Sequence, residues 1–500
     1  MKRTLIFVFA VLCAVNSFAF DVVSDNIYYN ILADNTAEVT YGYQRYTGEV
    51  HVPQNIVSNN QAYRVTGIGI AAFKNSPGLT ALYLPSSVEF IKSQAVSECP
   101  ALNTVYLPSG IKKVALDAFH NTQHIDRIYT GCSFELKKYF YLTVSPKIEI
   151  IDGTTVIDSL TFAGSKLKEI IIPASVKTIG RKAFYNCRQL AEVKLPYGLT
   201  NIQSEAFAGC SSLSVISLPE SVTSVGSKTF AGCRMLYKLE IPLSASSIGR
   251  NVIDSCLALT QLTAPVELLN NLQPVISTRI LKNLETGGGL LNETGYQFLK
   301  NNIKSITQLD INKICDSSVA DEFMTGAFQL ITIQLPSEIQ KTGIRAFAGC
   351  QSLQSLAFPS SITEIGKSSF ENCRQLKTVT FSPRNNLKTV GDWTFFNCIS
   401  LEKIQLPWGT KEIGEGVFNG CTALKSVVLP SSLTQIGANA FATCVSLRSI
   451  TSEATKPPVV KETTFAGVDQ NTIIFVPAKS INLYQTAPGW KDFKNIRAEE

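Results

Sequence analysis

The chain has 500 residues, of which 45% are hydrophobic and 17% are charged, and its formal net charge at pH 7 is +6. This composition excludes wholesale intrinsic disorder, because a chain with so many apolar residues can bury a large core. The excess positive charge is small and spread along the chain, so it does not predict nucleic-acid binding.

Residues 1–19 have the pattern of a secretory signal peptide. Lys2 and Arg3 give the segment its positive start, an apolar run follows, and the small residues before the expected cleavage point after Ala19 complete the pattern. The apolar run is too short to span a membrane as a helix, and no later stretch reaches about 18 apolar residues. We therefore expect a secreted or cell-surface protein with no transmembrane segment.

Residues 20–63 predict an N-terminal β cap. The segment is rich in tyrosine and alternates apolar with polar residues, for example over 37–41, as half-buried strands do. An array of stacked coils needs such a cap, because the open end of its first coil is otherwise bare core. We expect a hairpin over that end.

From residue 64 the sequence repeats itself with a period of about 23 residues, on the template L-x-x-I-x-L-P-x-S-V-x-x-I-G-x-x-A-F-x-x-C. The leucine-rich part alternates like a strand and ends at proline, which cannot donate a further ladder hydrogen bond. S-V-x-x-I predicts a second short strand, and glycine after it permits a tight turn. Apolar spacings of three around A-F-x-x-C predict a helical or 3₁₀ turn. One copy cannot bury its apolar positions alone, whereas stacked copies share one core.

Phenylalanine in the A-F position, here called the anchor, marks the register of the copies. Val96 and Ile253 fill the anchor slot in two further copies, and Phe162 and Phe328 serve in imperfect ones. The regular anchors are Phe73, Phe119, Phe184, Phe207, Phe230, Phe347, Phe370, Phe395, Phe418, Phe441 and Phe465.

The repeat pattern breaks at 266–305, between a first repeat block at 64–265 and a second block at 306–465. Within the break, Gly287–Gly289 lies between apolar segments and residues 292–300 predict a short helix. The flanking anchors are about three periods apart, so degenerate coils are the alternative to an irregular segment.

Residues 466–500 predict a C-terminal cap. The segment carries Tyr484, Trp490 and Phe493, and these aromatic side chains are expected to cover the last coil.

Two copies of the repeat, L-P-S-S-L-T-Q-I-G-A-N-A-F-A-T-C at 429–444 and L-P-E-S-V-T-S-V-G-S-K-T-F-A-G-C at 218–233, closely resemble the BspA-like family of leucine-rich repeats. The resemblance covers about 64–465 and the caps. It implies an α/β repeat fold, namely a leucine-rich-repeat solenoid with coils of about 23 residues. Such a solenoid has a parallel β-sheet of short strands, helical or 3₁₀ turns on the other face, a hairpin N-cap and an aromatic C-cap. The family also implies surface or secreted bacterial proteins, several of them adhesins, but the fold does not identify a ligand.

Thirteen cysteines raise the question of disulfides. Ten of them occupy one equivalent slot, three residues after the anchor, where stacking would place their Cα atoms about 5 Å apart with parallel Cβ vectors that disulfide geometry does not allow. We expect buried free thiols that pack as small hydrophobes; a redox or metal ladder is the alternative, although C-x₂-C zinc spacing is absent. Cys132 and Cys315 lie in irregular coils, and the sequence does not assign their redox state. The ten are Cys99, Cys187, Cys210, Cys233, Cys256, Cys350, Cys373, Cys398, Cys421 and Cys444.

The sequence offers no catalytic constellation. His120 and His124 are four residues apart but lack the glutamate of a metalloprotease motif, so we interpret them as exposed polar residues, with a metal pair as the alternative. Neither a nucleophile elbow nor a phosphate-binding loop pattern occurs. We therefore expect no enzyme activity, no cofactor and no metal site.

The outer face of the strands is where a ligand would bind. In L-x-x-I-x-L the last variable position points away from the core, and it holds Tyr83, Tyr106 and Tyr129 in three successive coils. Exposed rings offer contact area at little cost in entropy, so these three tyrosines are the candidate ligand-binding residues. The alternative is cross-strand packing that only stabilises the sheet.

These features predict a non-enzymatic extracellular protein-interaction solenoid, a bacterial surface adhesin that binds a host or microbial protein or glycan. A structural envelope scaffold with no host ligand is one alternative, and a solenoid that positions a glycan-processing partner is another. We expect a monomer and no nucleic-acid partner.

Overall fold

The computed structural model describes residues 20–122, 124–131, 147–272, 280–314, 316–382 and 384–499. The chain divides into two compact units, Met1–Ser175 and Val176–Glu500, which are called unit 1 and unit 2. The expected signal peptide at 1–19, Cys132 and Cys315 lie outside the described residues.

The regular secondary structure described in unit 1 consists of short strands joined by turns, together with one 3₁₀ turn, η1 (Ala33–Asn35). Its strands are β1 (Val22–Ser24), β2 (Ile27–Leu32), β3 (Thr36–Thr40), β4 (Thr47–His51), β5 (Asn55–Ser58), β6 (Gln61–Ile68), β7 (Gly78–Tyr83), β8 (Phe90–Ile91), β9 (Thr104–Leu107), β10 (Lys113–Val114), β11 (Arg127–Thr130), β12 (Lys147–Ile150), β13 (Val156–Ile157) and β14 (Glu169–Ile171).

The N-terminal cap is built from antiparallel hairpins, as predicted. β2 pairs with β1 and β3, and β5 pairs with β6. The turns Asp25–Asn26 and Asn59–Asn60 hold both residues at positive φ, which short polar side chains tolerate better than most. β3 then runs parallel to β6, and β4 runs parallel to β7. The cap therefore supplies the first strand of each parallel ladder in unit 1.

The two strands expected in each coil form two separate parallel ladders. In unit 1 the leucine-rich strands form the order β4-β7-β9-β11-β12, here called the face sheet, and the second parallel ladder has the order β3-β6-β8-β10. Both kinds of strand recur in unit 2, where Ser224 pairs with Ser247, the equivalent residue of the next coil. The predicted fold class, a leucine-rich-repeat solenoid with parallel sheets, is thus confirmed.

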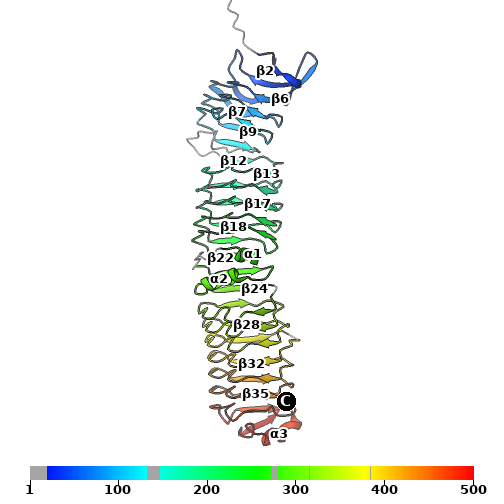
Figure 1. Cartoon of the computed structure of the whole chain (residues 1–500), viewed down its shortest axis with the longest axis vertical. Coiled ribbons are helices and arrows are strands. Elements are labelled where there is room, and N and C mark those ends of the chain that lie inside the picture. Colours follow the sequence, from blue (N-terminus) through cyan, green and yellow to red (C-terminus); the bar gives the residue numbers. More distant parts are fainter. Residues whose placement is uncertain are drawn as a thin grey trace, which may run out of the picture. The chain divides into compact units, whose positions relative to one another are not determined.

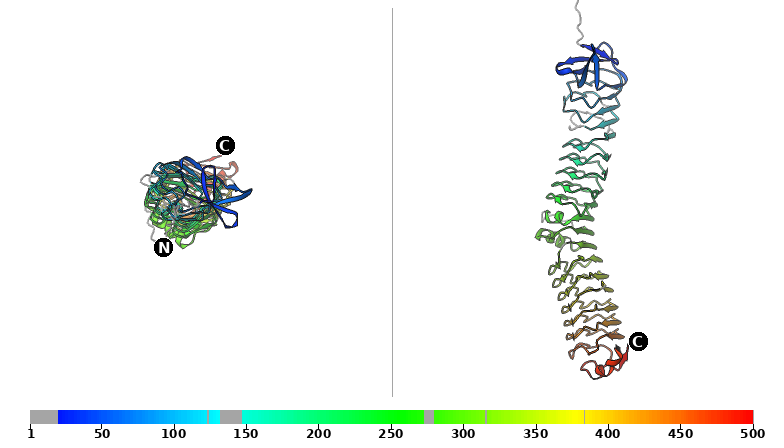
Figure 2. Two further views of the ribbon diagram at one scale, coloured as in Figure 1. Left: turned by 90° about the horizontal axis from the view of Figure 1, so that it is seen from above. Right: turned by 90° about the vertical axis from the view of Figure 1, so that its right-hand side faces the viewer.

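Unit 2 continues the same arrangement, and Figures 1 and 2 show its strands stacked coil upon coil. Its leucine-rich strands are β16 (Glu192–Lys194), β18 (Val215–Ser217), β20 (Lys238–Glu240), β22 (Gln261–Pro265), β23 (Asn283–Gly287), β24 (Gln308–Lys313), β26 (Thr332–Gln334), β28 (Ser355–Phe358), β30 (Thr378–Phe381), β32 (Lys403–Gln405), β34 (Ser426–Leu429), β36 (Ser449–Ser452), β37 (Ile473–Val476) and β38 (Asn495–Ala498). Its short strands are β15 (Thr178–Ile179), β17 (Asn201–Ile202), β19 (Ser224–Val225), β21 (Ser247–Ile248), β25 (Ser318–Val319), β27 (Lys341–Thr342), β29 (Glu364–Ile365), β31 (Thr389–Val390), β33 (Glu412–Ile413) and β35 (Gln435–Ile436).

The anchors form the centre of the core. In unit 2 successive anchor rings stack with centroids 5.0–5.8 Å apart and planes within 20° of each other. Val96, Ile253 and Phe162 are buried in the anchor slot, as predicted. The prediction for Phe328 is wrong, because its side chain is 42% exposed and Met324 fills the slot with no exposed surface.

The segment around the anchor differs from the predicted helical or 3₁₀ turn. The amide of Ala183 donates within its own coil to Gly180, but the next amide, of Phe184, donates to Ala206 in the following coil. This alternation requires left-handed backbone two residues before and after the anchor, at Lys182 (φ 57°) and Asn186 (φ 56°). A helix cannot contain such residues, so each coil closes through separate turns. The second left-handed position explains why Asn or Gly recurs between the anchor and the cysteine.

Replacing Gly232 by Ala is expected to lower the free energy of unfolding by about 1–2 kcal/mol. Gly232 has a φ of 75°, and an added Cβ would come no closer than 3.7 Å to Gly209, so the cost is conformational rather than steric. Gly232→Asn is the control, because Asn186 occupies the same slot at positive φ. Urea unfolding of both variants measures the difference, and an equal loss in both would contradict this explanation.

The ten repeat cysteines are buried free thiols, as predicted. Most of them also make a contact that the sequence does not reveal, since Sγ lies within hydrogen-bonding distance of the anchor carbonyl of the preceding coil. Cys210 Sγ is 3.2 Å from Phe184 O, and Cys421 Sγ is 3.3 Å from Phe395 O. A thiol is small enough for the core and can still donate weakly to a carbonyl that also accepts an amide of its own coil, as Phe184 O does from the Cys187 amide at 3.1 Å.

The break in the repeat at 266–305 contributes one coil rather than a gap. β23 pairs in parallel with both β22 and β24, and the short helix α1 (Val266–Asn270) precedes it. The predicted helix at 292–300 is present as α2 (Glu293–Asn302), and the side chain of Asn292 caps it by accepting a hydrogen bond from the Gly295 amide at 3.0 Å.

The C-terminal cap lays its aromatic side chains over the last anchor, as predicted. It contains the 3₁₀ turn η3 (Ala478–Ser480), the helix α3 (Ile481–Thr486) and strand β38. The rings of Trp490 and Phe493 each lie 5.2 Å from that of Phe465. Trp490 Nε1 donates to Pro458 O at 2.9 Å, and the Tyr484 hydroxyl donates to Ala454 O at 2.9 Å. These two buried polar groups of the cap are thereby satisfied.

Candidate functional site: a tyrosine ladder and groove in unit 1

The three predicted tyrosines lie side by side on the face sheet of unit 1. Tyr83 is in register with Tyr106, and Tyr106 with Tyr129, on strands β7, β9 and β11. Their ring centroids are 6.4 Å and 6.1 Å apart, and all three side chains are half-buried. The spacing of one repeat period between successive tyrosines therefore produces the ladder that the sequence predicts.

The ladder has a fourth ring that sequence reasoning missed. His51 on β4 is in register with Tyr83, and the two rings stack with centroids 4.1 Å apart and planes 4° apart. The alternation of apolar and polar residues in the cap places His51 on an exposed face of its strand. Assigning His51 to the ladder also requires knowing that β4 joins the face sheet. We refer to His51, Tyr83, Tyr106 and Tyr129 as the tyrosine ladder.

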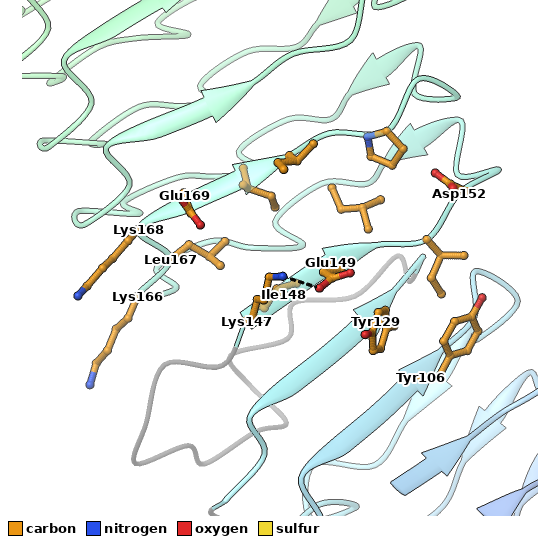
Figure 3. Close-up of a pocket in the computed structure, with 15 residues that line it drawn as sticks. Tyr106, Tyr129, Lys147, Ile148, Glu149, Asp152, Lys166, Leu167, Lys168 and Glu169 are labelled. Atoms are coloured by element: carbon orange, nitrogen blue, oxygen red, sulfur yellow. Dashed lines mark ion pairs between the residues drawn. The ribbon is translucent and has the colours of Figure 1, made fainter.

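A groove of about 840 Å³ adjoins the ladder, and Tyr106 and Tyr129 form part of its lining (Figure 3). It opens because the face sheet of unit 1 ends at β12, and β14, the next strand on this face, is not hydrogen-bonded to it. Neighbouring residues of a parallel strand direct their backbone groups to opposite sides. Since the Lys147 and Ile151 amides donate to the β11 side, those of Ile148 and Ile150 face the groove.

The floor of the groove is apolar and its rim is charged. Leu167 and Ile170 are buried in the floor, and Ile171 at the outward position is 67% exposed. On the rim, Lys147 pairs with Glu149 at 2.9 Å, and this is the ion pair drawn in Figure 3. The remaining charged residues of the lining are exposed, and none has an ion-pair partner within 4 Å in the described part of the chain. They are Asp152, Lys166, Lys168 and Glu169. Such a surface offers both apolar contact area and directional polar groups.

Other candidate sites weighed from the sequence gain no support from geometry. His120 and His124 are exposed side chains at a coil turn. Within the residues that the structure describes, no group of three or more His, Cys, Asp or Glu side chains is arranged to hold a metal ion. None of the described helices has both the length and the apolar character needed to cross a bilayer.

Comparison with known proteins places the repeats in a family. The model of the BspA type leucine rich repeat region matches in six copies, over residues 54–145, 155–274, 317–448 and 388–487. Comparison with curated proteins found no match.

Several solved structures are similar to this chain. A leucine-rich repeat protein from Bacteroides ovatus is 23% identical, with a TM-score of 0.32, over 96% of this chain and 100% of that one. A leucine-rich cell surface protein from Faecalibacterium prausnitzii is 23% identical, with a TM-score of 0.24, over 86% of this chain and 94% of that one. The pneumococcal vaccine antigen PcpA is 17% identical, with a TM-score of 0.28, over 96% of this chain and 98% of that one. Because the family model matches well over half of its residues, this chain belongs to the BspA-type leucine-rich repeat family.

Proposed function

We propose that this chain is an exported, non-enzymatic interaction protein of the bacterial surface, and that it acts as an adhesin. In this proposal the tyrosine ladder and the adjoining groove of unit 1 bind an extracellular protein or glycan. The observation that carries the proposal is the placement of Tyr106 and Tyr129, which belong to the ladder and also line the groove. A ligand on this face would contact aromatic rings and a partly apolar groove together.

The partial exposure of the rings supports ligand contact in addition to cross-strand packing. The ladder tyrosines are tilted by 30° and 35° to their neighbours at more than 6 Å, whereas the buried anchors of unit 2 stack within 20° at 5.0–5.8 Å. Centroids about 4.5–7 Å apart are ordinary for aromatic pairs, so the ladder rings also support one another across the sheet. The half-buried tyrosines keep part of each ring open to solvent, fixed in place by the sheet beneath. Rigid rings of this kind lose little entropy on binding.

Binding of the purified chain to an array of extracellular-matrix proteins and glycans, at physiological salt, tests the proposed function. Saturable binding that persists at raised salt is expected for at least one ligand class, because apolar contact is screened less than charge attraction. Antibody labelling of intact cells is the second arm, since an adhesin must be reachable from outside. Absence of binding by folded protein, together with absence of labelling, would favour a structural envelope scaffold instead.

A further inference from the structure

Because the coils repeat, a surface residue of one coil can be compared with the residues at the equivalent position of the other coils. The position after the strand-ending proline is small or polar in most coils, whereas Tyr197 and Trp408 hold this position with 80% and 76% of their surfaces exposed. These are large apolar side chains that the core does not need. Two other apolar residues hold this position, but Leu243 is half-buried and Val266 is buried. The small or polar residues at this position in other coils are Ser86, Ser109, Ala174, Glu220, Ser337, Ser360 and Ser431.

The coil beside Trp408 departs from the template a second time. Leu376 and Leu401 lie further apart than one regular period, and the extra residues fall between β30 and β31. Asn385 fixes this longer loop, because its Nδ2 donates to Pro359 O at 2.9 Å and its Oδ1 accepts from the Leu387 amide at 2.8 Å. Arg384 at the loop surface is exposed and has a φ of 61°. The loop therefore presents its arginine from a tethered backbone.

Trp408 and the longer loop with Arg384 and Asn385 line the same groove of unit 2, which has a volume of about 520 Å³. Volumes of roughly 300–1,000 Å³ are typical of sites for small ligands. None of the described residues that line it is acidic, and neither cation of the lining has an ion-pair partner within 4 Å in the described part of the chain. The lining residues that bear on its chemistry are Thr380, Arg384, Asn385, Lys403, Gln405 and Trp408.

We propose that this groove is a second binding site, and that its ligand is an acidic saccharide carrying carboxylate or sulfate groups. A pyranose ring offers C–H groups on one face, which the indole of Trp408 can cover, and hydroxyls at its edge, which Gln405 and Thr380 can hydrogen-bond. The planar guanidinium of Arg384 matches the oxygens of a carboxylate or sulfate, and Lys403 adds a second positive charge. The unpaired cations therefore select acidic over neutral sugars.

A single-stranded nucleic acid also combines flat rings with negative charge, but this groove fits it less well. Binding of such strands uses several aromatic platforms in succession and a basic track for the phosphates. Here the lining offers one highly exposed ring and two cations. The proposal rests on unit 2 alone and does not depend on the tyrosine ladder.

Titration of the full chain with defined oligomers, followed by calorimetry and tryptophan fluorescence, tests this site. The probes are a heparin hexasaccharide for sulfate, an oligogalacturonate for carboxylate, a malto-oligosaccharide as the neutral sugar and a short oligothymidylate. Trp490 is fully buried and Trp393 is half-buried, so a change in fluorescence on binding reports chiefly on Trp408. Saturable binding of either acidic saccharide, with little for the neutral one, is expected; the tighter acidic probe identifies the charged group.

Three variants locate the binding. Trp408→Ser installs the residue found at this position in other coils, so the fold is retained, and it should weaken acidic-saccharide binding at least about tenfold. Arg384→Gln combined with Lys403→Gln should weaken it by a similar factor and reduce its salt dependence. Tyr197→Ser is the matched control, because the coil of Tyr197 lacks the extended loop. This variant should leave the affinity unchanged. Equal loss in Tyr197→Ser, binding of the neutral sugar or oligothymidylate as tight as that of the acidic ones, or no binding of any probe would overturn the proposal.

Discussion

Unit 2 is expected to lose most of its stability between about pH 8 and pH 10 in the presence of a reducing agent. Burial raises the pKa of Cys233, Cys398 and Cys444 to about 12. An exposed thiol in the unfolded chain has a pKa of about 8.5. The folded state therefore keeps its thiol protons at a pH where the unfolded state releases them. The stability that a raised thiol pKa contributes is fully present below the pKa of the unfolded state. It is lost as the pH rises from that value toward the pKa of the folded state.

The expected effect is large because the cysteine slot is repeated. Each thiol that ionises only on unfolding lowers the free energy of unfolding by up to about 1.4 kcal/mol per pH unit. Burial likewise raises the pKa of Cys256 and Cys421, so several thiols act in the same direction. Native proteins have a total stability of only about 5–15 kcal/mol, so a rise of one or two pH units above the unfolded pKa should suffice to unfold unit 2.

Urea unfolding at several pH values in this window measures the proton linkage. Replacing Cys398 and Cys421 by Ala should reduce the slope of stability against pH by about 1.4 kcal/mol per pH unit for each thiol removed. Leu424→Ala is the control, because it removes a fully buried apolar side chain near Cys421 and should lower stability equally at every pH. Stability that does not change over the window, or a slope that the cysteine variant leaves as it was, would contradict this account.

Trp490→Ala is expected to destabilise unit 2 by about 3–5 kcal/mol, the range for removing a large aromatic side chain from a core. The side chain has no exposed surface, and its ring contacts those of Phe465 and Tyr484. It also satisfies the carbonyl of Pro458. Its removal opens a cavity over the last anchor, at the end of the core that a repeat array must cover.

Trp408→Ala is the matched control for this substitution, because it removes the same side chain from a position that is 76% exposed. Surface substitutions of this kind change stability by no more than about 0.5 kcal/mol. Urea unfolding followed by circular dichroism compares the two variants. If they unfold at the same urea concentration, the C-terminal segment does not act as a cap.

Much of the fold could be predicted because the chain repeats each local signal many times. A single copy of L-x-x-I-x-L-P is a weak indication of a strand, but its regular return fixes the period, the register and the anchor slots. Phe328 shows where the rule fails. The sequence offers a phenylalanine near the expected place, yet Glu322 (φ 54°) and Gly326 (φ 79°) take the two left-handed positions, and these flank Met324.

The candidate site was only partly predictable. The ladder positions of Tyr83, Tyr106 and Tyr129 follow from the period alone. The stacking of His51 on the ladder requires a parallel pairing between the cap and the first coil, which hydrophobic alternation does not reveal. The groove arises where β14 is not hydrogen-bonded to β12. The sequence marks this region with an irregular spacing between Phe119 and Phe162, but an irregular spacing does not reveal which strands fail to pair.

The most direct test of the tyrosine ladder is the affinity of a triple variant, Tyr83→Ser, Tyr106→Ser and Tyr129→Ser, for the tightest ligand found on the array. A variant with Tyr197→Ser and Tyr237→Ser is the control, because it removes two exposed tyrosines outside the ladder. We predict that the triple variant binds at least about tenfold more weakly while the control binds as the unaltered chain does. Unchanged affinity in a folded triple variant would contradict the assignment of this face as the ligand site.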